Sequence, residues 1–431
     1  MGEESSFVDQ RLQKRRWQKP WRHRESLLIA LLLLAGGFLL EVLTPDRGID
    51  VPGFPHNVLA ILVFATTLLF LHIFYRKSSF VRWLTGVPAA ISAILLLSVV
   101  ALMLGIVKQE NVPGSVPTIL GLTHVTNSWM LVMAQLFLLT VLGLVILKRS
   151  RRINRRNTGF LLNHAGLWIV IVAASLGSGD LQRLRMELQE GETVWYAYDE
   201  QQRVYELPFA VMLQEFHIEE YPPKIALVDI RTGTISEEVN RPFPEAGEGT
   251  EATILNYHLV VEEFIEEAWP ADGGFVESER AGSPPAALIT VESSNTDTLS
   301  GWISSGSYIV EPRFLHVSEE HVLAMTRPEP KKYQSFVRIY TEDREPYNEV
   351  IEVNDAPKVM GWHLYQLSYD QQKGKWSTTS VVEIVKDPWL YVVYAGIVLL
   401  FAGALYLLWF GKEQKTTGGT SGRGSERHIR N

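Results

Sequence analysis

The chain has 431 residues, enough for two or three domains, and it contains no cysteine. The lack of cysteine excludes disulfides, thiol chemistry, Cys-ligated metal centres and thioether attachment of a cofactor to this chain. Residues 179–386 contain 17 Lys and Arg against 37 Asp and Glu, a net charge of −20, whereas the remainder has a net charge of +12. This asymmetry predicts an acidic, water-facing domain joined to a basic-flanked membrane part, and no nucleic-acid partner is expected.

Six segments are apolar over the roughly 17–25 residues that a membrane-spanning helix needs. They are 27–43, 58–75, 83–106, 129–147, 160–176 and 388–410. We expect six transmembrane helices in the lipid bilayer, with the first five inside residues 27–177.

Two local features of the spans carry expectations. Pro88 should kink the third span, and its small neighbours Ala89 and Ala93 should permit close contact between helices. Four tryptophans at span ends are expected to lie in the interfacial belts: Trp83, Trp129, Trp389 and Trp409.

Lys and Arg in the short loops predict the direction of the spans. The counts are seven in 1–26, three in 76–82, six in 148–156, five after 410, and one each in 44–57 and 107–128. All the basic segments then lie on one side, so the arm 1–26 and a flexible tail 411–431 are expected in the cytoplasm. We expect a multi-pass protein of the bacterial inner (cytoplasmic) membrane, with residues 178–387 on the periplasmic side.

The outer segment has the pattern of strands. Short β-branched or aromatic runs with partial polar–apolar alternation are typical of β-structure. The runs are TVWYAY, PFAVMLQEFHI, KIALVDIR, YHLVVEEFI, AALITVES, FVRIYTED, HLYQLSYD and STTSVVEIV. They predict an all-β extracytoplasmic domain, an antiparallel sandwich or sheet stack, between the fifth and sixth helices.

No catalytic motif is present, and we expect no catalytic residue in this chain. Five histidines are scattered among the predicted strands, where surface or hydrogen-bonded core roles are expected: His217, His258, His316, His321 and His363. The paired acids of this domain, including Glu262–Glu263 and Glu266–Glu267, are expected to form a solvated face.

Several short features of the C-terminal half occur in a fixed order. They are Asn354 and Pro357 of an Asn-x-Pro strand with one extra residue, Gly361, Tyr365 and Gln366 of a Gly-x-x-x-Tyr-Gln strand, and Asp387–Pro388 before the last span. Upstream, a span beginning at Trp129, a basic loop and a histidine-containing span lead to the outer domain. Over residues 126–411 the chain therefore resembles the ResB family of System II cytochrome c biogenesis.

One departure from the family pattern concerns the first helices. Such proteins commonly have three spans before the outer domain, whereas five are predicted here. Two added spans preserve the orientation of everything that follows. The purpose of the added spans stays open.

The resemblance implies a function. Such proteins work with a CcsA/ResC-type membrane partner that carries a tryptophan-rich haem-handling loop, and together they present haem to the reduced Cys-x-x-Cys-His of apocytochrome c. A thiol-reducing, thioredoxin-like protein contributes indirectly. The chain is thus expected to be non-catalytic alone, a subunit of a cytochrome c haem lyase complex that helps carry haem across the membrane.

The resemblance also implies a site residue. A transmembrane histidine of the family is taken to ligate haem near the inner side, and His164 matches it by context. Neutral imidazole is a standard axial ligand, so His164 is the expected iron ligand of non-covalently held haem b. Gly166 is expected to leave space for the flat macrocycle. The alternative is a histidine near the membrane interface that is hydrogen-bonded to a neighbouring helix.

Other assignments stay open. His72, near the end of the second span, is the competing haem contact, and His56, His124 and His363 are further possibilities. A membrane-anchored sensor or assembly factor with a β-sandwich outer domain, without a role for haem, would also explain the topology.

Overall fold

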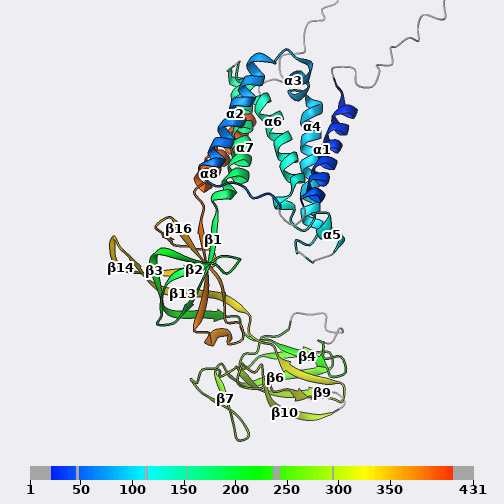
Figure 1. Ribbon diagram of the computed structural model, residues 1–431. Coiled ribbons are helices and arrows are strands. Elements are labelled where there is room, and N and C mark those ends of the chain that lie inside the picture. The colour runs from blue at the N-terminus through cyan, green and yellow to red at the C-terminus, as the bar shows by residue number, and fades with distance from the viewer. Residues whose placement is uncertain are drawn as a thin grey trace, which may run out of the picture. The chain divides into compact units, whose positions relative to one another are not determined.

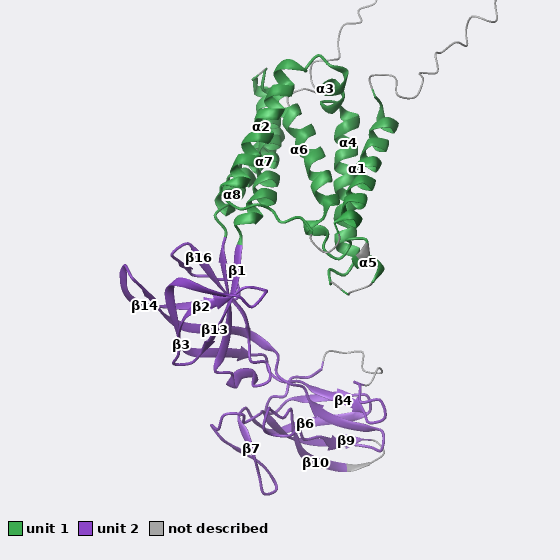
Figure 2. Ribbon diagram, viewed as in Figure 1, with its two compact units in different colours: residues 1–181, 387–431 green, residues 182–386 purple. Residues whose placement is uncertain are grey.

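A computed structural model describes residues 21–44, 48–110, 112, 115–151, 153–235, 243–293 and 296–410. The chain divides into two compact units, one of residues 1–181 and 387–431 and one of residues 182–386 (Figure 2). The first unit is helical and the second is built from strands (Figure 1). Among the described residues, six helices are long and apolar enough to cross a membrane. The predicted fold class, six membrane helices with a large β domain between the fifth and the sixth, is confirmed.

The helical unit alternates direction from one long helix to the next (Figure 1). The long helices are α1 (His23–Leu43), α2 (His56–Phe74), α4 (Val87–Ile106), α6 (Trp129–Ser150), α7 (Arg155–Gly177) and α8 (Leu390–Phe410). The short ones are α3 (Ser79–Leu84), α5 (Val116–Ile119) and the 3-10 turns η1 (Val125–Asn127) and η2 (Ser178–Asp180). α1 and α4 pack on α6, while α8 packs on α7. Large apolar side chains such as Leu31, Leu62 and Phe401 remain exposed, as lipid contact requires.

The third span begins later than predicted. Trp83 belongs to α3, and α4 begins at Val87. Pro88 lies in the first turn of α4, where its missing N–H would have no intrahelical partner, so Pro88 starts the helix and does not kink it. Ala89 and Ala93 are fully buried, which agrees with the expected close contact.

Three of the four span-end tryptophans are bonded inside the helical unit. The indole N–H groups of Trp83, Trp129 and Trp389 donate to Ser26 Oγ (2.7 Å), Thr44 Oγ1 (3.0 Å) and Asp180 Oδ2 (2.7 Å), respectively. Trp83 is also 4% exposed. These bonds anchor the three indoles within the helical unit, while Trp409 is 78% exposed at the end of α8.

The second unit contains four sheets, whose strands pair antiparallel in every named ladder. The largest has the order β14-β13-β3-β2-β1-β17-β16-β15, and the others are β10-β9-β6-β5, β11-β12-β4 and β7-β8. The strands are β1 (Gln182–Gln189), β2 (Thr193–Tyr198), β3 (Val204–Glu220), β4 (Ile225–Asp229), β5 (Glu251–Ile254), β6 (Tyr257–Ile265), β7 (Ala268–Ala271), β8 (Gly274–Glu277), β9 (Ala286–Ser293), β10 (Thr296–Ser304), β11 (Leu315–His316), β12 (His321–Met325), β13 (Pro330–Thr341), β14 (Arg344–Glu352), β15 (Lys358–Val359), β16 (Trp362–Tyr369) and β17 (Thr379–Lys386). A 3-10 turn, η3 (Gly374–Trp376), precedes β17.

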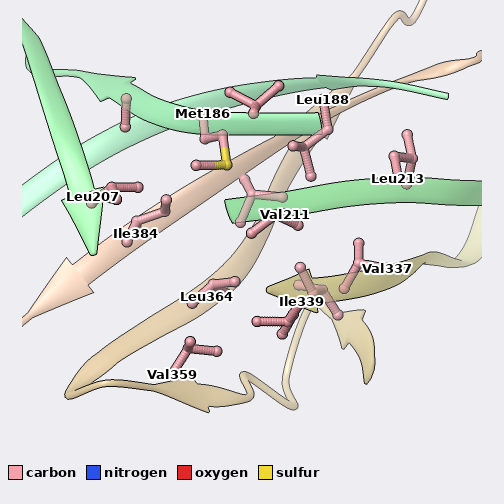
Figure 3. Close-up of a cluster of buried hydrophobic side chains, with 14 of the residues drawn as sticks. Met186, Leu188, Leu207, Val211, Leu213, Val337, Ile339, Val359, Leu364 and Ile384 are labelled. Atoms are coloured by element: carbon pink, nitrogen blue, oxygen red, sulfur yellow. The ribbon is translucent and has the colours of Figure 1, made fainter. Parts of the chain in front are cut away.

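Alternating strand residues build two main cores. In the eight-stranded sheet, Met186, Leu213 and Ile339 point into one cluster, so the sheet curls around its own core (Figure 3). In the smaller part, Leu227 of β4 and Ile289 of β9 share a second cluster, so these two sheets pack face to face. The sandwich thus describes the smaller sheets and not the large one.

Two residues of the family-like C-terminal segment have clear structural roles. Gly361 has φ of +88° in the β15–β16 hairpin, a conformation that favours glycine. Gln366 is 5% exposed and bonds Ser380 of the adjacent strand β17 (2.9 Å) and Ser335 of β13 (2.6 Å), which is distant in the strand order. Gln366 therefore serves the fold.

Candidate functional site

His164 lies within α7, well away from its ends. Asn154 caps the helix by accepting from the backbone N–H of Asn157 (2.9 Å), so α7 begins at Arg155 and not near Phe160. Nine residues separate Arg155 from His164, which places the imidazole about 13 Å along the axis. The predicted span begins at Phe160, about 6 Å before His164 along the axis, so the histidine lies deeper along its helix than the sequence indicated.

A single hydrogen bond fixes the tautomer of the His164 imidazole. Nδ1 lies 3.0 Å from the carbonyl oxygen of Phe160, one turn earlier, and the two rings stack with centroids 3.6 Å apart. Because a carbonyl can only accept, Nδ1 must carry the proton, and the lone pair of the neutral ring is on Nε2. The described residues provide no hydrogen-bond partner for Nε2, and the side chain is half-buried.

The ring belongs to a stripe on one face of α7. Phe160, His164 and Trp168 are four residues apart, so they lie on the same face. At one end the guanidinium of Arg149 lies 4.6 Å from the centroid of Phe160. At the other end Trp168 donates to a backbone carbonyl of α6 (3.2 Å) and stacks on Phe64 of α2. The stripe therefore faces α2 and α6.

His72 lies on the corresponding stripe of α2. Phe64, Leu68 and His72 are also four residues apart, and Leu68 is 3% exposed, so this face points inward. α2 and α7 run antiparallel, because Asn57 in the first turn of α2 donates to the carbonyl of Leu176 near the end of α7 (3.2 Å).

The two histidines consequently lie on facing stripes at nearby heights. The stacked pair of Phe64 and Trp168 marks a common level. From that level, toward the same end of the bundle, His164 is one turn away, about 6 Å, and His72 is two turns away, about 12 Å. The helices thus bring the two sequence-predicted residues onto one side of the α2–α6–α7 group.

Gly166 does not leave space for a macrocycle. It is buried, and a Cβ on Gly166 would lie 2.5 Å from the backbone nitrogen of Leu400 in α8. Gly396 and Gly403 of α8 meet α7 just as closely, so these glycines serve helix packing. The expected role of Gly166 was wrong, because α8 occupies the space that its missing side chain leaves.

His124 has a partner that sequence reasoning missed. Its Nε2 lies 2.7 Å from Oε1 of Glu41, a carboxylate of α1 that is 2% exposed, and Oε2 accepts from the backbone N–H of Trp129 (2.9 Å). The only signal in the sequence was an acid inside an apolar run. His56 is exposed at the first residue of α2, apart from this pair.

Asp180 is a second polar junction that the sequence did not reveal. Its carboxylate accepts from the backbone N–H of Phe54 (2.6 Å), the amide of Asn57 (2.7 Å) and the indole of Trp389 (2.7 Å). These bonds tie the beginnings of α2 and α8 to the end of α7. Asp387 accepts from the backbone N–H of Trp389 (2.9 Å), just before α8 begins at Leu390.

The histidines of the strand unit stay apart from one another. His217, His258 and His316 are exposed, whereas His321 and His363 are half-buried. Within the described ranges no group of three or more His, Asp or Glu side chains could hold a metal ion.

Comparison with known proteins adds one distant likeness. No known family model matches the chain, and no curated protein does. A solved structure titled "Cytochrome c Heme Lyase CcmF" is similar at 13% identity over 90% of this chain and 46% of that chain, with a TM-score of 0.22. The chain spans less than half of that protein's length, and a TM-score this low does not establish a shared fold.

Proposed function

We propose that this chain is a ResB-like subunit of a System II cytochrome c maturation complex. It takes up haem b without a covalent bond and, with a CcsA/ResC-type partner, presents it to the Cys-x-x-Cys-His of apocytochrome c. The resemblance over residues 126–411 supports this function. The observation that carries it is the free Nε2 of His164, held in one orientation by the Phe160 carbonyl.

The chemistry of that nitrogen suits a haem ligand. An imidazole that binds iron usually donates its other ring N–H to a carbonyl or carboxylate, which fixes the tautomer and makes the ligating nitrogen more basic. His164 has this arrangement, with Nδ1 bound to Phe160. His72 is the second candidate contact, on the facing stripe of α2.

The orientation and the boundaries of the parts belong to the same proposal. The arm 1–26 and the tail 411–431 are cytoplasmic, the spans occupy 27–177 and 388–410, and residues 178–387 lie in the periplasm. The partner supplies the tryptophan-rich loop that this sequence does not contain, and a thioredoxin-like protein keeps the client thiols reduced. The chain is then non-catalytic alone.

Partner dependence tests this function. The chain is expressed with a reporter apocytochrome c in a bacterial host without a maturation system, with and without a CcsA-type protein. We expect covalent haem staining of the reporter only when both proteins are present. Holocytochrome made by this chain alone, or none made by the pair, would refute the proposal.

A membrane-anchored assembly factor or sensor without haem is the second candidate. It is favoured by the stacking of His164 on Phe160 and by the filled space at Gly166, which account for the ring without a ligand. A Soret band in the chain purified without its partner would exclude this alternative.

A further inference from the structure

A cavity of about 530 Å³ opens in the strand unit where the ends of β3 and β6 meet η3. Its lining combines carboxylates, aromatic rings and four prolines, and it includes Glu220, Glu266, Phe264, Lys375 and Trp376. This volume is in the range of pockets that bind drug-sized molecules. It is larger than a single ammonium ion would need. No function assigned above uses this cavity.

Two of the four lining glutamates are already neutralised. Glu219 pairs with Lys331 (2.5 Å), and Glu267 pairs with Lys375 (2.9 Å). Glu220 and Glu266 have no ion pair or hydrogen bond with any described residue. Burial raises the pKa of Glu220, Lys375 opposes that shift, and the charge of Glu266 adds to it. The lining therefore carries a surplus of negative charge.

Lys375, which belongs to the lining, shows that the cavity can hold an alkylammonium group. The ammonium of Lys375 contacts Glu267 and lies 5.3 Å from the centroid of the Trp376 ring. A carboxylate and an aromatic face thus already hold one alkylammonium group here. Proline offers no backbone N–H, so the proline walls together with the carboxylates make a lining that is rich in acceptors. Such a lining complements a ligand that is cationic and donates hydrogen bonds.

We propose that this cavity binds a lysine-bearing extended segment of a partner polypeptide, with a lysine ammonium on Glu220 and Glu266. The lysine stem packs on Trp376 and Phe264. Proline and aromatic walls suit an extended chain, and the surplus of negative charge selects a basic one. A metal ion is a poorer fit, because the described residues gather no third ligand around these carboxylates. The site requires no haem, so it can be tested independently of the proposed function.

Fluorescence anisotropy tests the site on the full chain in detergent. The probe is fluorescein-labelled hexalysine, and hexaglutamate with the same label is the negative control. The double variant Glu220→Gln, Glu266→Gln removes the two unpaired charges with little change in shape. The matched variant Glu262→Gln, Glu263→Gln removes two exposed charges of β6 that lie outside the cavity.

We expect hexalysine to bind the cavity variant at least about tenfold more weakly than the unchanged chain, and the β6 variant less than about twofold more weakly. Trp376→Leu should also weaken binding, whereas Trp376→Phe should largely retain it. If the two double variants lose the same affinity for hexalysine, the net charge of the chain explains the binding and the proposed site is wrong. Absence of hexalysine binding would overturn it as well. The small diamine 1,5-diaminopentane and unlabelled hexalysine are compared as competitors of the probe. If the diamine displaces the probe as effectively as hexalysine does, the cavity is a site for small amines and the proposed polypeptide ligand is wrong.

Discussion

Three carboxylates are buried or half-buried, and they differ in their hydrogen-bond donors. Glu41 accepts from His124 and from the Trp129 amide, and Asp180 accepts three N–H groups. These two hold helices together. Glu220 is half-buried without such donors, which is why it is the carboxylate best suited to bind a ligand.

Glu220→Gln should change the pH dependence of stability. The pKa of Glu220 is raised in the folded chain, so the native state binds more protons than the unfolded state, and stability falls as pH rises through that range. Glutamine does not ionise, so the variant does not lose this stability as pH rises. We expect the variant to have a higher Tm than the unchanged chain at pH 7.5 and almost the same Tm at pH 4.

Thermal unfolding of the full chain in detergent, followed at several pH values, measures this effect. Glu262→Gln is the control, because this glutamate is exposed on β6. An identical gain for both variants, or a gain that persists at pH 4, would contradict the assigned burial.

Single-residue reasoning from sequence found isolated groups but not their partners. An imidazole in an apolar run marked His164, since few polar groups occur there. The same reasoning could not pair Glu41 with His124, which is 83 residues away and belongs to another segment. It also assigned free space to Gly166, because which side of a helix a neighbour covers is a tertiary property.

At the scale of elements, apolar length predicted the long helices well and their ends poorly. The run through α3 and α4 is apolar enough to read as one span, and this concealed the break at Thr85 and Gly86. The strands were found through their alternation. Their order in the large sheet, where β1 lies between β2 and β17, depends on long-range pairing that local pattern does not specify.

Adjacent glycines of α1 offer a matched test of helix packing. A Cβ on Gly37 would lie 2.8 Å from the Cα of Met130 in α6, whereas nothing lies within 4 Å of the same position at Gly36. Gly37→Ala must push α1 from α6 and should lower stability by about 1–3 kcal/mol. Gly36→Ala should be neutral or slightly stabilising, since alanine favours the helix.

Thermal aggregation of the two variants in the same detergent compares them directly. Equal melting temperatures would contradict the packing of α1 on α6. A loss for Gly36→Ala alone would reverse the assigned faces of α1.

At the scale of the whole molecule, the basic residues that precede α4 and those that end α6 lie at the same end of the helical unit. Lys148 at the end of α6 bonds Thr85, which follows α3 (3.2 Å), and Arg149 covers Phe160 near the start of α7. Loop charge predicts that the arm 1–26 and the tail 411–431 lie at this end too, but residues 1–20 and 411–431 lie outside the described residues. On the orientation proposed above, this end faces the cytoplasm.

Proteolysis tests that orientation. Trypsin added to intact spheroplasts should degrade the segment 182–386, which contains many Lys and Arg sites, and should spare a tag at the C-terminus. Inverted vesicles should give the opposite result. Loss of the β unit only in inverted vesicles would reverse the topology.

The central claim is that His164 Nε2 binds haem iron, and one measurement tests it most directly. Haem content per purified complex is determined by absorbance for His164→Ala and His72→Ala, each co-expressed with the CcsA-type partner, with and without imidazole in the medium. We predict a loss of at least about tenfold for His164→Ala, because an axial donor is removed, and partial restoration by imidazole, which replaces that donor. Haem content should change little in His72→Ala. Normal haem content in His164→Ala would contradict the claim, and a loss confined to His72→Ala would assign the ligand to α2.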